Sequence, residues 1–202
     1  MFGREKLNRK EGEAVAQCWT ASTDDNMAFA VINDGIYASD FSDGEIRMTL
    51  LRSAGYSASA FSLGEPYHEP MFMHRMEQGE REYAFKIVAG DADEVMSGID
   101  RQAAAFNMKP YALPFCPSGQ GEKVPPALVI DKSNVTLSAL KRSERDADKY
   151  IVRVYETGGA DTEYSIESPI FNVSFSGKLA AFEIKTFEIS EGSFKEITLL
   201  EE

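Results

Sequence analysis

This chain has few of the residues that build metal sites and disulfide frameworks. Its 202 residues include 2 cysteines, 2 histidines and 1 tryptophan. Cys18 and Cys116 stand far apart without a CxxC spacing, which argues against a zinc or redox motif and predicts two reduced thiols. No apolar run approaches the roughly 20 residues of a membrane-spanning helix. The first residues also lack the apolar stretch of a signal peptide, so we expect a cytoplasmic protein.

Positive charge is scarce relative to negative charge. The chain has 21 lysines and arginines against 33 aspartates and glutamates, which gives a formal net charge of −12. Phosphate backbones and anionic lipid surfaces would repel such a protein, so we expect neither nucleic acid nor a membrane as partner. With 43% apolar and 27% charged residues, the composition is that of an ordinary globular protein.

Composition divides the chain into three parts. Residues 1–13 form a polar lead-in without periodicity. A first β region follows at 14–117, and a second β region at 127–202 is expected to pack on the first as one continuous structural unit. Prolines and glycines concentrate between the two, which is typical of a connecting loop.

One helix is predicted, at about residues 91–106. Val95, Ile99 and Ala103 are spaced four residues apart and therefore fall on one apolar stripe. Asp91 or Asp93 can accept hydrogen bonds from the first free N–H groups of this helix. The helix is expected to lie on the surface of a protein that otherwise consists of strands.

The second region contains short β-prone runs at regular spacing, separated by Asp, Gly and Ser turns. This pattern is typical of an antiparallel β-sandwich. We therefore predict a mainly β protein, an antiparallel, supersandwich-like β-sandwich with one surface helix. The runs are Leu128–Ile130, Val135–Lys141, Tyr150–Tyr155, Thr162–Ile166, Ile170–Phe175, Ala181–Ile189 and Phe194–Leu199.

The segment Phe29–Ser53 reads as a hairpin that carries a site. It holds a β-prone run, the turn tripeptides Asn33-Asp34-Gly35 and Ser42-Asp43-Gly44, and an alternating run from Ile46 to Leu50. Ala14–Ser22, with Trp19, is predicted to be a strand that pairs with Met27–Asn33. Asn and Asp can each engage two neighbouring sugar hydroxyls, and Tyr offers a stacking face. The alternative is that the tripeptide is only a turn.

The residues Asn33, Asp34 and Tyr37, with the run Leu50-Leu51-Arg52-Ser53, resemble the start of the C-terminal β region of glycoside hydrolase family 38, the α-mannosidases. Other stretches resemble the family in the same order, and together they span most of the chain. They are Glu77–Phe85, Phe106–Pro110, Val135–Glu144, Tyr150–Glu156 and Phe182–Phe187.

The resemblance implies a non-catalytic part of an enzyme that hydrolyses terminal α-mannose with retention. Family members carry their nucleophile and metal ligands on an N-terminal α/β barrel, which this chain lacks, so the chain alone is expected to be inactive. It would support that barrel as its partner and line the mannoside cleft. No cofactor is expected here, and zinc or another divalent metal is expected in the parent enzyme. Homo-oligomers are possible.

By the same resemblance, Asn33, Asp34 and Tyr37 become candidate substrate-binding residues. Arg52 is a fourth candidate, with pairing to a neighbouring carboxylate as its alternative. No residue is predicted to be catalytic, because the resemblance places the nucleophile on the barrel. No residue is predicted to bind a metal, because His68 and His74 have no metal-ligand spacing.

Two other function classes stay open. A stand-alone carbohydrate-binding or protein-interaction sandwich would expose aromatic side chains on one sheet face. An enzyme fragment would instead expose an apolar patch where the catalytic part docks. An independent hydrolase would need a compact acid pair in a pocket, and the sequence offers no such pair.

Overall fold

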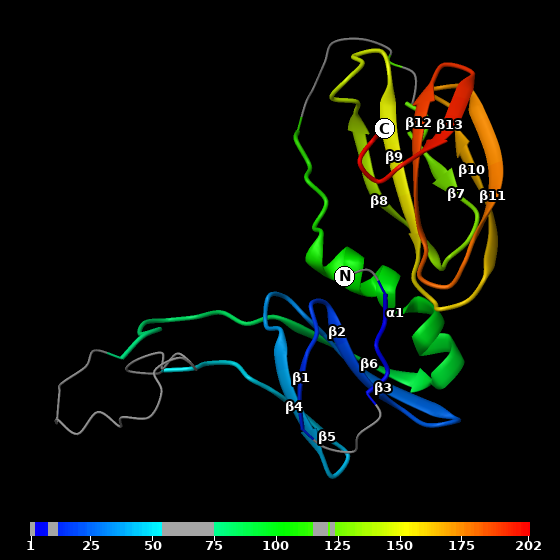
Figure 1. Ribbon diagram of the computed structural model, residues 1–202. Helices are drawn as coiled ribbons and strands as arrows, with labels where there is room; N and C mark the ends of the chain where they lie inside the picture. The colour runs from blue at the N-terminus through cyan, green and yellow to red at the C-terminus, as the bar shows by residue number, and fades with distance from the viewer. Residues whose placement is uncertain (1–2, 8–11, 54–74, 115–120, 122–123) are drawn as a thin grey trace, which may run out of the picture.

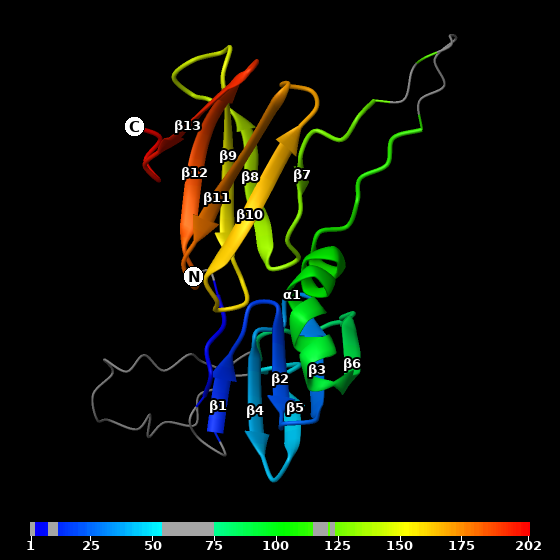
Figure 2. The same cartoon turned by 90° about the vertical axis from the view of Figure 1, so that its right-hand side faces the viewer.

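The computed structural model describes residues 3–7, 12–53, 75–114, 121 and 124–202 (Figure 1). Its strands form two lobes, and a helix lies between them (Figures 1 and 2). The first lobe contains β1 to β6 and α1, and the second contains β7 to β13. The predicted fold class is confirmed, because the described strands pair antiparallel and the described part contains a single helix. That helix is not long and apolar enough to cross a membrane.

The first lobe contains two three-stranded sheets, with strand orders β1-β4-β5 and β2-β3-β6. The sheets touch where Thr20 Oγ1 lies 3.5 Å from Ser39 Oγ, and Ser39 is buried there. Val31 and Asn33, on the same face of β3, are buried too. The strands are β1 Gly12–Val15, β2 Trp19–Thr23, β3 Met27–Asn33, β4 Ala38–Ser42, β5 Glu45–Met48 and β6 Phe85–Asp91.

The hairpin expected over Phe29–Ser53 is only half correct. β4 and β5 do form a hairpin across Asp43 and Gly44. β3, however, pairs with β2 and β6, so Asn33-Asp34-Gly35 is a crossover between two sheets. The strand expected over Ala14–Ser22 is likewise divided into β1 and β2, one in each sheet. The physical reason is that both faces of β3 are covered toward its C-terminal end, one by the helix and the other, at Val31 and Asn33, by the second sheet.

Helix α1 spans Ala92–Asn107, in agreement with the prediction. The Asp91 carboxylate caps it by accepting the backbone N–H groups of Asp93 and Glu94 at 3.0 and 3.1 Å. Three residues of its apolar stripe are buried against small and aliphatic residues of β3. This core consists of Ala28, Ala30, Ile32, Val95, Ile99 and Ala103.

The second lobe is a sandwich of a three-stranded sheet, β11-β10-β7, and a four-stranded sheet, β13-β12-β9-β8. All seven runs predicted from the sequence contain a strand. Inward and outward side chains alternate along β10, as the burial of Thr162, Tyr164, Ile166 and Ser168 shows. The strands are β7 Val129–Ile130, β8 Val135–Arg142, β9 Tyr150–Glu156, β10 Thr162–Ser168, β11 Val173–Leu179, β12 Ile184–Ser190 and β13 Ser193–Ile197.

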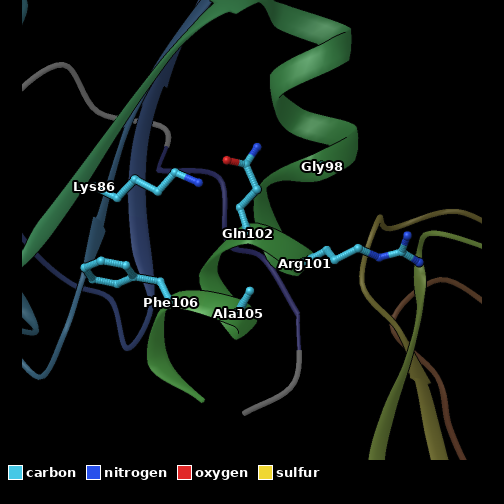
Figure 3. Close-up of a pocket in the computed structure, with 6 residues that line it drawn as sticks. All are labelled: Lys86, Gly98, Arg101, Gln102, Ala105 and Phe106. Atoms are coloured by element: carbon cyan, nitrogen blue, oxygen red, sulfur yellow. The ribbon is translucent and has the colours of Figure 1, made fainter. Parts of the chain in front are cut away.

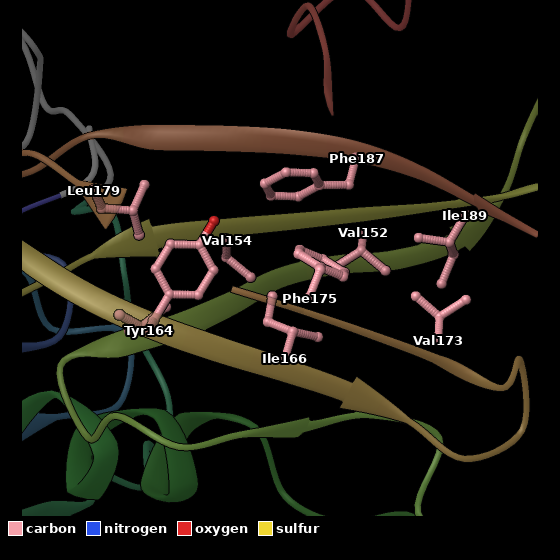
Figure 4. Close-up of a cluster of buried hydrophobic side chains, with 10 residues drawn as sticks. Val152, Val154, Tyr164, Ile166, Val173, Phe175, Leu179, Phe187 and Ile189 are labelled. Carbon is pink, nitrogen blue, oxygen red and sulfur yellow. The ribbon is translucent and has the colours of Figure 1, made fainter. Parts of the chain in front are cut away.

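Aromatic and β-branched side chains from both sheets fill this sandwich (Figure 4). Phe175 packs between Phe187 and Phe194, with ring centroids 4.9 and 4.2 Å away. Tyr164 also points inward, and its hydroxyl has no hydrogen-bond partner among the described residues. Burial, with the negative charges of Glu196 and Glu183, raises the pKa of that hydroxyl to about 12.

A buried carboxylate organises the end of β9. Glu156 is fully buried and accepts five N–H groups. The backbone donors Gly158, Gly159 and Phe182 lie 2.6, 2.7 and 3.0 Å from its oxygens, and Asn134 Nδ2 lies 2.9 Å away. Ala160 completes the set at 3.3 Å. The turn after β9 is therefore folded around one negative charge.

Candidate functional site

The candidate site is the segment from Asn33 to Ala38, called the Asn33 loop below. It connects the end of β3 to the start of β4 and so passes from one sheet of the first lobe to the other. Backbone contacts fix both of its ends. The Asn33 N–H donates to the Cys18 carbonyl at 2.9 Å, and the Tyr37 carbonyl accepts the Ala16 N–H at 2.8 Å.

Asn33 is fully buried. Its amide Nδ2 donates to the Ala16 carbonyl at 3.2 Å. The amide oxygen has no hydrogen-bond partner among the described residues. Leaving such a group unpaired costs about 1–3 kcal/mol, and departures of this kind are expected at functional sites.

The C-terminal end of α1 is tied to the same point. Asn107 Nδ2 donates to the Asn33 carbonyl at 3.0 Å and to the Ala103 carbonyl at 3.0 Å. The backbone N–H of Met108 then closes the helix on the Ala104 carbonyl at 2.8 Å. The position of the loop therefore depends on how the helix packs.

The middle of the loop presents polar groups to solvent. The Asp34 side chain is 41% exposed, and its Oδ2 lies 3.8 Å from Lys109 Nζ. Gly35 has a φ of +81°, which a glycine adopts without strain. The Tyr37 side chain is half exposed. A carboxylate, an ammonium group and a phenol are thus available from a fixed backbone, and groups of these kinds can bind hydroxyls.

Arg52 lies apart from the other three predicted residues. Its side chain is exposed, and its backbone N–H lies 3.4 Å from Glu77 Oε2. In the part of the chain that the structure describes, no hydrogen bond or ion pair joins it to Asn33, Asp34 or Tyr37. The structure thus brings Asn33, Asp34 and Tyr37 into one loop, and their role in binding stays a prediction.

Sequence reasoning assigned no role to Asn107 or Lys109, the residues that reach the loop from the helix end. The signal was present, because both belong to the stretch Phe106–Pro110 that carries part of the family resemblance. Their contact with β3 spans 74 residues of sequence and cannot be read from local periodicity.

A separate hollow of about 480 Å³ lies between β6 and α1 (Figure 3). Lys86 and Gln102 point toward each other above it, whereas Arg101 projects away. Its floor is formed by Gly98, Ala105 and Phe106. A second hollow, of about 550 Å³, lies over β10 and β11 and includes Lys132 and Lys178. Neither contains a predicted site residue.

No group of three or more His, Cys, Asp or Glu side chains in the described residues could hold a metal ion. His68 and His74 fall outside the described residues, as does Cys116. The described residues therefore do not fit the metal that the family resemblance implies.

Comparisons with known proteins agree with the geometry of the second lobe. Residues 134–202 match the model of the family described as "Glycosyl hydrolases family 38 C-terminal beta sandwich domain". This range begins just before β8 and continues beyond β13. A search of the curated proteins found no match.

Two solved structures from Enterococcus faecalis are similar over both lobes. One, described as an alpha-mannosidase from strain V583, has a TM-score of 0.71 and 15% identity over 91% of this chain. The other, described as a protein in glycosyl hydrolase family 38, has a TM-score of 0.71 and 18% identity over 89% of this chain. At these identities the likeness shows the fold.

The chain spans less than a quarter of the length of these structures, namely 22% and 23%. The family resemblance seen in the sequence is confirmed by the match over the second lobe. Over residues 134–202 this chain matches the C-terminal β-sandwich domain of glycosyl hydrolase family 38, and its first lobe shares the fold of the two solved structures.

Proposed function

We propose that this chain is the non-catalytic C-terminal β part of an α-mannosidase, which docks on an N-terminal catalytic barrel and lines the mannoside cleft. The family match over 134–202 supports this proposal, as does the similarity of both lobes to about a quarter of an α-mannosidase. The whole enzyme would hydrolyse terminal α-mannose with retention. The metal of the family would be held by the catalytic barrel.

An apolar patch on the first lobe is the observation that carries the docking proposal. Met27, Phe29 and Ile87 are 54%, 42% and 66% exposed. Met27 and Phe29 alternate along β3 with Ala28 and Ala30, which face the helix, so the patch lies on the opposite face of this sheet, at the end of β3 where the side chains are exposed. Ile87 pairs with Val31 and is therefore diagonal to Phe29.

The rival function, a stand-alone binding module, is less well supported by the exposed side chains. It predicts aromatic residues gathered on one sheet face. The exposed aromatics of the described part are instead distributed over β3, β13 and several connecting segments, namely Phe29, Tyr37, Tyr111, Phe182 and Phe194. The apolar patch, which combines Met27, Phe29 and Ile87, favours a protein surface as the partner.

Replacing Ile87 by aspartate is expected to weaken binding to the catalytic barrel at least about tenfold, because a charge would be buried against apolar surface. Binding of the two separately purified parts can be measured by calorimetry. Leu200→Asp is the matched control, since Leu200 is 76% exposed but lies on the second lobe. Equal affinities for wild type and Ile87→Asp, with both proteins folded, would exclude the patch as the docking face.

Replacing Asp34 by alanine is expected to raise KM for an aryl α-mannoside about tenfold in the reassembled enzyme, with a smaller change in kcat. The reason is that a hydrogen bond to a sugar hydroxyl contributes to substrate and transition state alike. Tyr37→Phe should act in the same direction. Asp25→Ala, an exposed carboxylate in the β2–β3 turn, is the control. Unchanged KM values for both loop variants would remove the Asn33 loop from the cleft.

A further inference from the structure

Arg4, near the start of the described chain, is fixed to the helix. Its guanidinium donates to Asp100 Oδ2 through Nη2 at 2.6 Å and through Nε at 3.1 Å. The same Nη2 donates to the Met96 carbonyl at 2.7 Å. The side chains of Arg4 and Asp100 are only 18% and 23% exposed. Because two N–H groups of Arg4 donate to the same carboxylate oxygen, the orientation of the guanidinium is fixed as well as its distance.

The other carboxylate oxygen of Asp100 accepts a hydrogen bond from Trp19, the single tryptophan of the chain. Trp19 Nε1 donates to Asp100 Oδ1 at 2.9 Å, so both carboxylate oxygens are used. The Arg4 guanidinium carbon lies 5.5 Å from the centroid of the indole ring, within the range of a cation–π contact. Arg4 therefore joins the segment 3–7 to α1 and β2 together.

The residue before Arg4 touches the other lobe. Gly3 has a φ of +130°, and a methyl group on its Cα would lie 2.8 Å from Phe182 Cδ1. The same ring covers Gly159, where a methyl group would lie 2.7 Å from Phe182 Cζ. Phe182 donates its N–H to the buried Glu156 carboxylate, so the ring is attached to the core of the second lobe.

Tyr155 on β9 also lies within electrostatic range of the first lobe. Burial and the negative charges of Asp100 and Cys18 raise the pKa of Tyr155, which belongs to β9. Tyr155 is thus near the helix that Arg4 holds. Figures 1 and 2 both show the segment 3–7 beginning near the boundary of the two lobes and then following the first lobe.

We propose that Gly3 and Arg4 form a strap that couples the two lobes, with Arg4 fastened to Asp100 and Trp19 and Gly3 seated on the Phe182 ring. The strap sets the orientation of the second lobe relative to α1. Because α1 also positions the Asn33 loop through Asn107, the strap fixes this loop relative to the sandwich. This coupling is a property of the chain alone and does not require a sugar substrate.

The test uses the 202-residue chain and three single variants. Arg4→Ala releases one end of the strap, Gly3→Val forces the other end off the Phe182 ring, and Lys6→Ala is a control in the same segment. Urea unfolding is followed by Trp19 fluorescence for the first lobe and by amide hydrogen exchange of the β9 and β12 strands for the second lobe. Small-angle X-ray scattering gives the overall dimensions.

Coincident transitions are expected for the wild type and for Lys6→Ala. In Arg4→Ala and in Gly3→Val the two transitions should separate and the maximum dimension should increase. The two variants act at opposite ends, so a local defect at Asp100 cannot explain both. Coincident transitions and unchanged dimensions in both variants would overturn the proposal. A change in Arg4→Ala alone would also overturn it, because Arg4 would then stabilise only the first lobe.

Discussion

Replacing Glu156 by glutamine is expected to lower the free energy of unfolding of the second lobe by about 3 kcal/mol. The wild-type carboxylate is fully buried and accepts five N–H groups. A glutamine keeps one acceptor oxygen but directs its own NH₂ group toward N–H donors, so part of the turn after β9 loses its partners. The measurement is urea unfolding followed by circular dichroism.

The same carboxylate predicts a dependence on pH. Burial alone would raise the pKa of Glu156, but the hydrogen bonds from Phe182, Gly159, Asn134 and Gly158 outweigh it and hold the pKa below the ordinary value of 4.5. A lowered folded-state pKa contributes stability that is present above the unfolded-state pKa and is lost as the pH falls through the folded-state value. The difference in stability between wild type and Glu156→Gln should therefore be full at pH 7 and shrink below about pH 4.5.

Glu163→Gln is the matched control, because Glu163 is an exposed carboxylate on the neighbouring strand β10. It should leave the unfolding midpoint nearly unchanged at pH 7. If Glu156→Gln were as stable as this control at neutral pH, the buried carboxylate would not organise the turn.

Replacing Ile99 by alanine is expected to destabilise the first lobe by about 2–5 kcal/mol. Ile99 is fully buried in the middle of α1, and it packs in a core whose β3 members include Ala28, Ala30 and Ile32. Ala28 and Ala30 are too small to move into the cavity that Ile99→Ala would leave. We therefore expect a loss of stability above the lower limit of this range. The Trp19 fluorescence transition should move to lower urea.

Arg101→Ala on the same helix tests whether this loss comes from burial. Arg101 is exposed at the hollow between β6 and α1, and alanine favours helix, so the free energy of unfolding of this variant should stay within a few tenths of a kcal/mol of wild type. A comparable loss in both variants would contradict the assignment of Ile99 as the central contact between helix and sheet.

The helix and the second-lobe strands could be predicted from sequence because they depend on local periodicity. The spacing of Val95, Ile99 and Ala103 predicts a helix with one buried stripe. The alternation along Thr162–Ser168 predicts a strand with one buried face. The Gly158-Gly159 pair likewise indicated a turn. That Glu156 lies at the centre of this turn could not be inferred, because one of its donors, Phe182, lies 26 residues away.

The first lobe was harder to predict because its strands alternate between two sheets. The turn residues between β3 and β4 are compatible with a hairpin of these two strands. The structure instead packs the β1-β4-β5 sheet against the face of β3 that carries Val31 and Asn33. The same packing buries the Asn33 side chain and leaves Asp34 and Tyr37 exposed. The candidate residues were named from sequence, but which of them face solvent is a tertiary property.

The most direct test of the proposed function is hydrolysis of an aryl α-mannoside with added zinc or cobalt, measured for this chain, for the catalytic barrel and for their mixture. We expect the mixture to be active, this chain alone to be silent, and the barrel alone to be much weaker than the mixture. Hydrolysis by this chain alone would contradict its non-catalytic role. Equal activity of the barrel with and without this chain would contradict its place in the mannoside cleft.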